Sequence, residues 1–142
     1  MKIERSALVL HSAAKMYALV KDVPSYTEFL SWCKSAEVHD QTETSQEASL
    51  AVSIAGIEQR FTTLNQLNPG HSVEMQLLEG PFKDLLGKWQ FTPLGEDGSK
   101  VSLVMDFHMT QGPMASLFGR GFGKIADRLV DDFCKRADEV YS

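Results

Sequence analysis

Hydrophobic and polar residues alternate with a period of two over much of the chain. The most regular alternation places apolar side chains at Val101, Leu103, Met105, Phe107 and Met109. Shorter stretches with the same period cover residues 3–11, 48–54, 60–67, 73–77 and 89–91, and turn-forming Gly, Pro or Asn residues separate most of the later ones. A period of two indicates strands that bury one face. The pattern therefore predicts an antiparallel sheet of six or seven strands joined by short turns.

Helical spacing appears in three places. Ser12 is suited to cap a short helix over Ala13–Val20. Apolar residues between positions 26 and 33 follow the spacing i, i+3, i+4, i+7, which predicts a short amphipathic helix around Ser25–Trp32. From Pro113 to Tyr141 the apolar residues keep a helical period, which predicts one long amphipathic helix.

The order of these elements predicts a single α+β domain over residues 1–142. The apolar stripe of the long C-terminal helix needs an apolar sheet face to cover it. We therefore expect a curved antiparallel sheet wrapped around this helix, with the short helices at one end. The space between helix and sheet is either a filled core or a ligand cavity, and the pattern leaves both interpretations open.

Composition narrows the class of protein. The chain is 43% hydrophobic and 23% charged, as in ordinary globular domains. No apolar run approaches the roughly 20 residues of a membrane-spanning helix, and the first ten residues lack the apolar centre of a signal peptide, so we expect a cytoplasmic protein. The two cysteines, Cys33 and Cys134, are too few for a disulfide framework. The four histidines lack metal-ligand spacing, so we expect no metal site.

Charge is unevenly distributed. The formal net charge of −5 argues against DNA and general nucleic-acid binding. Residues 35–59 contain five acids and no Lys or Arg, whereas residues 107–126 contain Arg120 and Lys124 and no acid. These regions are either solvated faces or a local binding patch. Further along, Asp132 and Arg136 are one helical turn apart, which predicts an ion pair between them.

Glycines interrupt the predicted C-terminal helix at Gly119, Gly121 and Gly123. Each costs about 0.5–1 kcal/mol of helix stability relative to Ala. They either allow neighbours to pack closely against the helix or make this half of it mobile. Their spacing does not match the G-x-G-x-x-G of a dinucleotide-binding loop.

Catalytic motifs are absent from the sequence. It contains no nucleophile elbow and no P-loop. Asp106 and His108 would face the apolar interior only if the register of their strand were reversed. We therefore expect a binding protein and no enzyme.

Three sequence blocks resemble one known family. Residues 22–33, D-V-P-S-Y-T-E-F-L-S-W-C, are similar to its pattern D-V-x-x-Y-x-x-F-L-x-W-C, although Ser31 stands where many relatives have Pro. Gly80-Pro81-Phe82 with the segment from Leu86 to Phe91 resembles its second block, and Phe118-Gly119-Arg120 resembles a third. The family is the coenzyme Q-binding START-domain group, also described as polyketide cyclase/dehydrase-like, which includes bacterial ribosome-association toxins.

The resemblance implies a helix-grip (START-like) fold with an apolar cavity. It implies binding of ubiquinone or a similar polyprenyl lipid, as a carrier or chaperone that supports respiration, with no separate cofactor. Transient contact with the inner-membrane surface would accompany lipid exchange. The resemblance also implies a rival role, in which the protein binds the large ribosomal subunit and blocks subunit association. The sequence leaves lipid and ribosome open as partners.

Each role predicts its own set of contact residues. For an apolar ligand, the expected lining is Val52, Ile54, Phe61, Met75, Leu77, Trp89, Phe91, Leu103, Met105 and Phe107 from strands, with Phe118, Phe122, Ile125 and Leu129 from the helix. Phe29 and Trp32 are expected to form a gate near Gly119–Gly123. For ribosomal RNA, the expected contacts are an acid-poor set at one end of the fold: Lys83, Lys88, Arg120 and Lys124.

Overall fold

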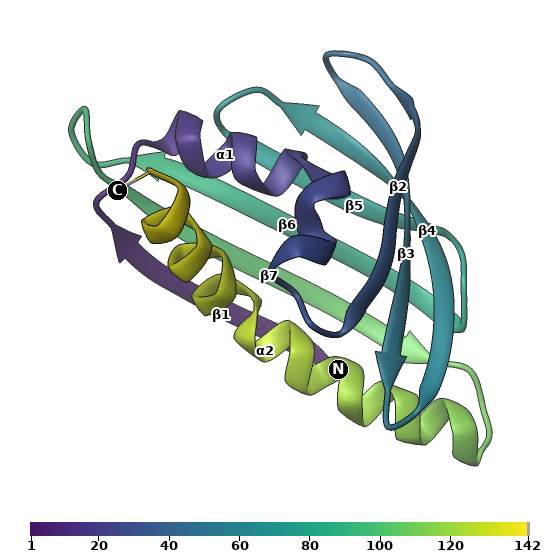
Figure 1. The fold of residues 1–142 in the computed structure, drawn as a ribbon. Coiled ribbons are helices and arrows are strands. Elements are labelled where there is room, and N and C mark those ends of the chain that lie inside the picture. Colours follow the sequence, from purple (N-terminus) through teal and green to yellow (C-terminus); the bar gives the residue numbers. More distant parts are fainter. Residues whose placement is uncertain (142) are drawn as a thin grey trace.

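The sheet and helices follow the predicted order, with one strand added. A computed structural model describes residues 1–141 (Figure 1). The elements are β1 (Lys2–Val9), α1 (Ala13–Lys21), the 3-10 helix η1 (Val23–Glu28), β2 (Cys33–Gln41), β3 (Ser45–Ile54), β4 (Ile57–Asn68), β5 (Ser72–Glu79), β6 (Phe82–Pro93), β7 (Ser99–Met109) and α2 (Pro113–Tyr141). The seven strands form one antiparallel sheet in the order β1-β7-β6-β5-β4-β3-β2. This arrangement confirms the α+β helix-grip prediction.

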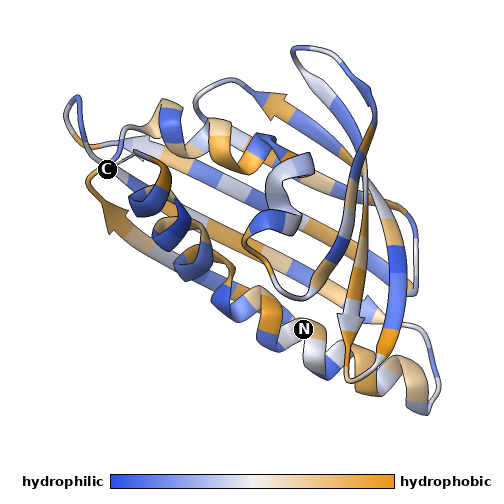
Figure 2. Ribbon diagram, viewed as in Figure 1, coloured by the Kyte–Doolittle hydropathy of each residue, from blue (hydrophilic) through white to orange (hydrophobic). Residues whose placement is uncertain are grey.

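Helices cover one face of the sheet. Figure 1 shows α2 running across this face, with α1 and η1 beside it. Apolar and polar residues alternate along the strands and along α2 (Figure 2), as the amphipathic pattern predicts. The core lies between the two layers, where the side chains of Phe91, Phe107, Phe118 and Phe133 are each no more than 2% exposed. No helix within residues 1–141 has an apolar stretch long enough to cross a membrane.

Local sequence signals fix several of the boundaries. The Ser12 hydroxyl accepts a hydrogen bond from the Lys15 backbone N–H at 3.2 Å, which caps α1 as predicted. Ala55 and Gly56 both have positive φ angles, 51° and 80°, and connect β3 to β4 in a two-residue turn. Two consecutive residues with positive φ match the twist of a hairpin, so this connection is one of the short turns that the strand pattern predicts.

Two predicted boundaries around η1 are wrong. The expected amphipathic helix at Ser25–Trp32 is instead the shorter η1, which begins beside Pro24 and has no side-chain cap at Asp22. Short 3-10 segments commonly serve as connectors, and η1 connects α1 to the turn before β2. The following strand, β2, was not predicted because it is an edge strand whose residues are mostly exposed, and its pairing with β3 shifts register twice.

The glycines of α2 pack closely against their neighbours. A Cβ atom at Gly119 would lie 2.5 Å from Met109 Cγ, and one at Gly121 would overlap Ile54 Cγ2. At Gly123 it would lie 2.7 Å from the Met1 sulfur. Of the two interpretations that the sequence left open, the structure therefore favours close packing.

Candidate functional site

An apolar cavity of about 70 Å³ lies between α2 and the sheet. Residues from η1, the turn before β2, the five strands β3–β7 and α2 contribute to it: Val23, Tyr26, Trp32, Ala48, Leu50, Phe61, Thr63, Asn65, Met75, Leu85, Trp89, Met105, Phe122, Ile125, Leu129 and Phe133. Met75 of this lining packs against Gly87 of β6, where a Cβ would lie 2.6 Å from the Met75 methyl group. Since one water takes about 30 Å³ of liquid, the cavity holds only a few waters and no lipid in this conformation.

Half of the predicted ligand-binding residues line this cavity: Trp32, Phe61, Met75, Trp89, Met105, Phe122, Ile125 and Leu129. The other eight lie outside the lining: Phe29, Val52, Ile54, Leu77, Phe91, Leu103, Phe107 and Phe118. Several of these fill the space under the first half of α2, where Phe82 contacts the rings of Phe107, Phe118 and Phe122 at centroid distances of 4.9–6.1 Å. The interior is thus a filled core at one end and a small cavity at the other.

Two polar side chains that the sequence pattern did not predict also line the cavity. Thr63 and Asn65 are only 7% and 5% exposed. The Thr63 hydroxyl donates to Asn65 Oδ1 at 2.8 Å, and Asn65 Nδ2 donates to Gln46 Oε1 at 2.9 Å. A primary amide has two N–H donors, and the hydrogen bond to Gln46 uses one of those of Asn65. The sequence signal for these two residues is their spacing of two along β4, which places them on the same inward face as Phe61.

Tyr26 is a third polar group at the cavity. Its hydroxyl donates a hydrogen bond to the Val20 carbonyl, and burial raises the pKa of its phenol far above the ordinary value. The hydroxyl therefore stays protonated and committed to the backbone at neutral pH. Asp106 and His108, in contrast, are exposed on the outer face of β7, as the predicted register requires.

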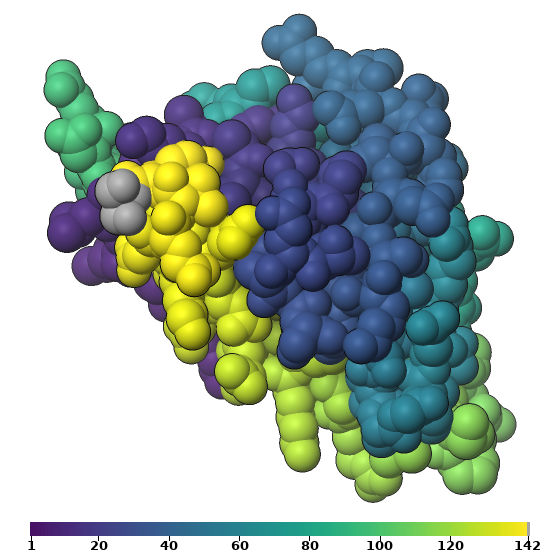
Figure 3. All heavy atoms as spheres, viewed as in Figure 1, coloured from purple at the N-terminus to yellow at the C-terminus, as the bar shows by residue number. Residues whose placement is uncertain are grey.

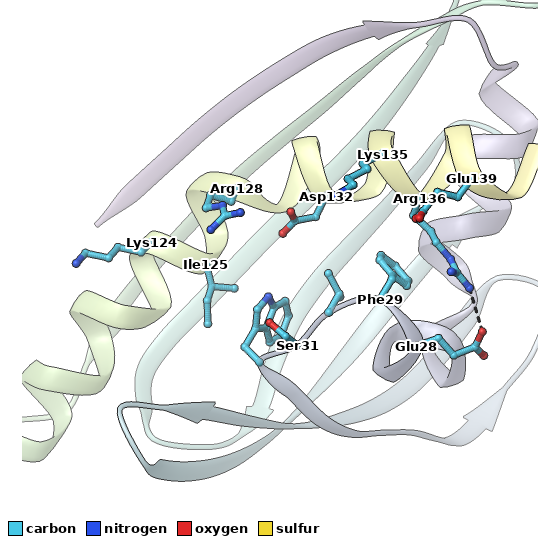
Figure 4. A pocket seen from close by; sticks show the side chains of 12 residues that line it. Glu28, Phe29, Ser31, Lys124, Ile125, Arg128, Asp132, Lys135, Arg136 and Glu139 are labelled. Carbon is cyan, nitrogen blue, oxygen red and sulfur yellow. Dashed lines mark hydrogen bonds and ion pairs between the residues drawn. The ribbon is translucent and has the colours of Figure 1, made fainter. Parts of the chain in front are cut away.

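A groove of about 440 Å³ lies on the outer side of the same part of α2. It separates α2 from the segment 28–32, which lies beside it on the surface (Figure 3). Its lining is Glu28, Phe29, Leu30, Ser31, Trp32, Lys124, Ile125, Arg128, Asp132, Lys135, Arg136 and Glu139. Figure 4 shows Ile125, Arg128 and Asp132 directed from α2 toward this segment.

Arg136 closes one end of the groove. Its Nη2 donates to Glu28 Oε1 at 2.9 Å, and its guanidinium carbon lies 5.1 Å from the centre of the Phe29 ring (Figure 4). The predicted pair of Arg136 with Asp132 is therefore wrong, because the segment 28–32 offers both a carboxylate and an aromatic face. Burial is the main cause that raises the pKa of Asp132.

The predicted gate is also placed differently. The Phe29 ring packs on Phe133 at a centroid distance of 5.1 Å, more than two helical turns beyond Gly123. Trp32 contributes to both the groove and the cavity, together with Ile125. Trp32 therefore lies near the end of the glycine segment, whereas Phe29 does not.

The four predicted basic residues do not form one patch. Lys124 lines the groove, and Arg120 is exposed one turn earlier on α2. Lys83 and Lys88 are exposed on β6, where Lys88 Nζ lies 3.5 Å from Glu74 Oε1 on the face of the sheet opposite to α2. Alternation along the strand requires this, because the flanking residues of Lys88 are buried.

Arg128 joins Arg120 and Lys124 in what we call the basic row. The three residues are spaced by four positions and share one side of α2. Arg128 lies just outside the acid-poor stretch 107–126 of the sequence, because Asp127 precedes it. In the structure the Asp127 carboxylate is paired with Arg5 of β1 and faces away from the groove lining.

Comparison with solved structures defines the class of fold. An aromatase/cyclase, Zhui from Streptomyces sp. R1128, superposes with a TM-score of 0.85 at 17% identity, covering 100% of this chain and 96% of that one. A START superfamily protein from Mycobacterium smegmatis superposes with a TM-score of 0.80 at 18% identity, covering 98% of both chains. At these identities the likeness shows the START-like fold alone.

Sequence comparison gives the family. The chain belongs to the polyketide cyclase / dehydrase and lipid transport family, whose model matches residues 9–134. It is 45% identical over 140 residues to a protein named ribosome association toxin RatA from Vibrio cholerae, covering 99% of this chain and 97% of that protein. It is 44% identical to the persistence and stress-resistance toxin PasT of Escherichia coli, covering 99% and 89%.

A more distant relative connects the chain with the coenzyme Q-binding group. The mitochondrial coenzyme Q-binding protein COQ10 homolog B of Xenopus laevis is 27% identical, covering 92% of this chain and 55% of that protein. These relatives confirm the resemblance that the three sequence blocks indicated.

Proposed function

We propose that the protein associates with the ribosome by binding RNA of the large subunit along the basic row. The observation that carries the proposal is the position of Lys124 and Arg128 in a groove that also contains Phe29 and Trp32. Cationic side chains bind phosphates with release of counterions, and aromatic rings stack on unpaired bases. Relatives named ribosome association toxin, 42–45% identical, support the same role. Such a role requires a cytoplasmic protein.

Charge distribution supports this surface in a chain whose formal net charge is −5. Arg5 is paired with Asp127 and Arg136 with Glu28. Asp132 and Glu139 also line the groove, whose four cationic side chains, Lys124, Arg128, Lys135 and Arg136, still exceed its three acids by one. Of the acids of residues 35–59, four belong to β2, β3 and the turn between them, and Glu58 lies on β4 near the hairpin that packs on Gly121; none of the five lines the groove. RNA would therefore approach along α2.

Charge reversal tests the proposal. We expect the double variant Lys124→Glu/Arg128→Glu to lose co-sedimentation with purified large ribosomal subunits. The matched control, Lys83→Glu/Lys88→Glu, changes the net charge equally on the opposite side of the sheet and should keep binding. The wild-type affinity should fall with salt, with a log–log slope of about −2 to −3 for three phosphate contacts. Equal loss in both variants, or binding insensitive to salt, would refute this surface.

A second candidate function is the binding of ubiquinone or a similar polyprenyl lipid in the cavity. The observation in its favour is an apolar lining that holds the amide of Asn65 and the hydroxyl of Thr63, which suits a lipid with a single oxygen-bearing end. Met114 and Leu117, 59% and 37% exposed beside Arg120, would serve transient membrane contact. Native mass spectrometry of protein from its host, followed by organic extraction, tests for a bound lipid.

We propose binding without catalysis for this cavity. Support comes from Tyr26, whose hydroxyl is held protonated on the Val20 carbonyl, and from the outward direction of Asp106. Thr63 and Asn65 do not titrate near neutral pH. Turnover of polyketone substrates that is lost in Asp106→Asn would contradict this proposal.

A further inference from the structure

We infer that occupation of the apolar cavity and binding of RNA in the groove exclude each other through the side chain of Trp32. The inference rests on the proposed function of the groove. Among residues 1–141, Trp32 and Ile125 are the two that line both spaces. One indole ring and one aliphatic side chain therefore form the wall between a charged groove of about 440 Å³ and an apolar cavity of about 70 Å³.

A ligand larger than a few waters needs space that only a moving wall can supply. The strand walls are fixed by the sheet ladder. On α2, Phe133 is held by the rings of Tyr26, Phe29 and Trp89 at centroid distances of 5.1–5.3 Å. Trp32, in contrast, is only half-buried and borders the open groove. Met75 also borders an open pocket, on the outer face of the sheet, but Trp32 is the aromatic side chain of the cavity lining whose far side opens on the groove.

The backbone of Trp32 is fixed while its ring is free to turn. Its carbonyl accepts a hydrogen bond from the Ser53 N–H at 2.9 Å, and the Cys33 N–H donates to the Leu30 carbonyl at 2.9 Å. Leu30 and Cys33 are 2% and 4% exposed, which anchors the turn on both sides. Rotation of the indole about its own side-chain bonds is therefore sufficient to enlarge the cavity.

The turned indole would occupy the groove beside the basic row. RNA stacked against Trp32 in its present position keeps the cavity closed. A ligand in the cavity pushes the indole into the groove, where the indole fills the space that an RNA base needs. Two ligands that favour different positions of one side chain are coupled negatively, and the coupling acts equally in both directions. The protein would thus bind the ribosome when empty and release it when loaded with an apolar ligand.

Binding to the large subunit tests the coupling, with farnesol as a neutral probe that has an apolar chain and one hydroxyl. We expect saturating farnesol to raise the apparent Kd for purified large subunits at least fivefold, within the usual range of coupling between two sites. Trp32→Leu should bind farnesol and lose the effect of farnesol on the Kd. The matched control Phe29→Leu alters an aromatic residue that lines the groove and not the cavity, so it should keep the effect.

Fluorescence reports the movement independently of the ribosome. Trp32 and Trp89 are the only two tryptophans, so Trp89→Phe leaves Trp32 as the sole emitter. Farnesol should shift its emission to longer wavelength as the indole turns into the solvated groove. If this variant does not fold, the difference between the spectra of the wild type and Trp32→Leu isolates Trp32, because Trp89 also lines the cavity. The absence of a shift at saturation refutes the movement.

The outcomes separate the coupling from the proposed function. Absence of subunit binding by the untreated protein refutes the proposed function. Subunit binding that farnesol leaves unchanged, while Trp32 emission shows that farnesol has bound, refutes the coupling alone. An equal effect of farnesol on wild type and Trp32→Leu also refutes it, because the ring would then not carry the signal.

Discussion

The two halves of α2 differ in how closely they pack against the rest of the protein. In the first half, Gly119 and Gly121 let Met109 and Ile54 approach the helix backbone, and phenylalanine rings fill the space beneath it. In the second half, the cavity lies on one side of the helix and the groove on the other. We call these regions the tight half, residues 113–123, and the open half, residues 124–141.

The difference shows where this fold has room for function. Protein interiors are packed as densely as organic crystals, so a region without spare volume resists any added atom. The tight half anchors α2 on β3, β7 and the first residue of the chain. The open half carries every residue that α2 contributes to the groove, and three of the four that it contributes to the cavity. Substitutions should therefore have different consequences in the two halves.

The largest effect should come from the ring that holds the open half together. Phe133 is 1% exposed and contacts the rings of Tyr26, Phe29 and Trp89. We expect Phe133→Ala to lower the free energy of unfolding by about 3–5 kcal/mol, the usual cost of removing a buried Phe. Urea denaturation measures it. A loss below about 1 kcal/mol would mean that the open half does not depend on this ring.

A smaller loss is expected from a single methyl group in the tight half. Gly121→Ala should destabilise the protein by about 1–3 kcal/mol, because the new Cβ overlaps the rigid branched carbon of Ile54. Helix propensity alone predicts the opposite sign, a gain of up to about 1 kcal/mol. Thermal and urea unfolding distinguish the two.

Gly123→Ala is the matched control for this prediction. Its Cβ meets the end of the Met1 side chain, which is 54% exposed and free to move away. We therefore expect a neutral or slightly stabilising effect at Gly123. Stabilisation at both positions would contradict the description of a tight half.

Much of the fold followed from periodicity, and the failures have physical causes. The strands around Leu103 and the long helix from Pro113 were predictable because each buries one continuous face. The strand β2 was not predicted because an edge strand buries few of its residues. The segment around η1 was predicted as an α-helix because four apolar residues have helical spacing, but only six residues form the helix and no side chain caps it.

The candidate site was less predictable than the fold. Apolar alternation identified the inward face of the sheet, so half of the predicted ligand-binding residues do line the cavity. Alternation does not show which inward residues contact each other and which border a cavity. Phe107 and Met105 follow the same pattern, yet one lies in the filled core and the other lines the cavity. The groove depends on pairings distant in sequence, such as Arg5 with Asp127, that no local pattern reveals.

The smallest predicted effect is a gain of stability, at the cavity beneath the open half. Ala48 of β3 is 4% exposed and borders the cavity. Ala48→Val should place its added carbons in the free volume and raise the free energy of unfolding by about 1 kcal/mol, since each buried CH₂ contributes about 0.8 kcal/mol. It should also weaken farnesol binding.

Ala51→Val controls for the strand preference of valine, because Ala51 lies on the same strand, is also buried and does not line the cavity. By strand alternation Ala51 faces the other side of the sheet from Ala48 and the cavity, so this variant should show no gain or a loss of stability. Chemical denaturation of the two variants compares them directly. If Ala48→Val is destabilised as much as Gly121→Ala, then the space under the open half does not accept an added side chain. The contrast between the two halves of α2 would then fail.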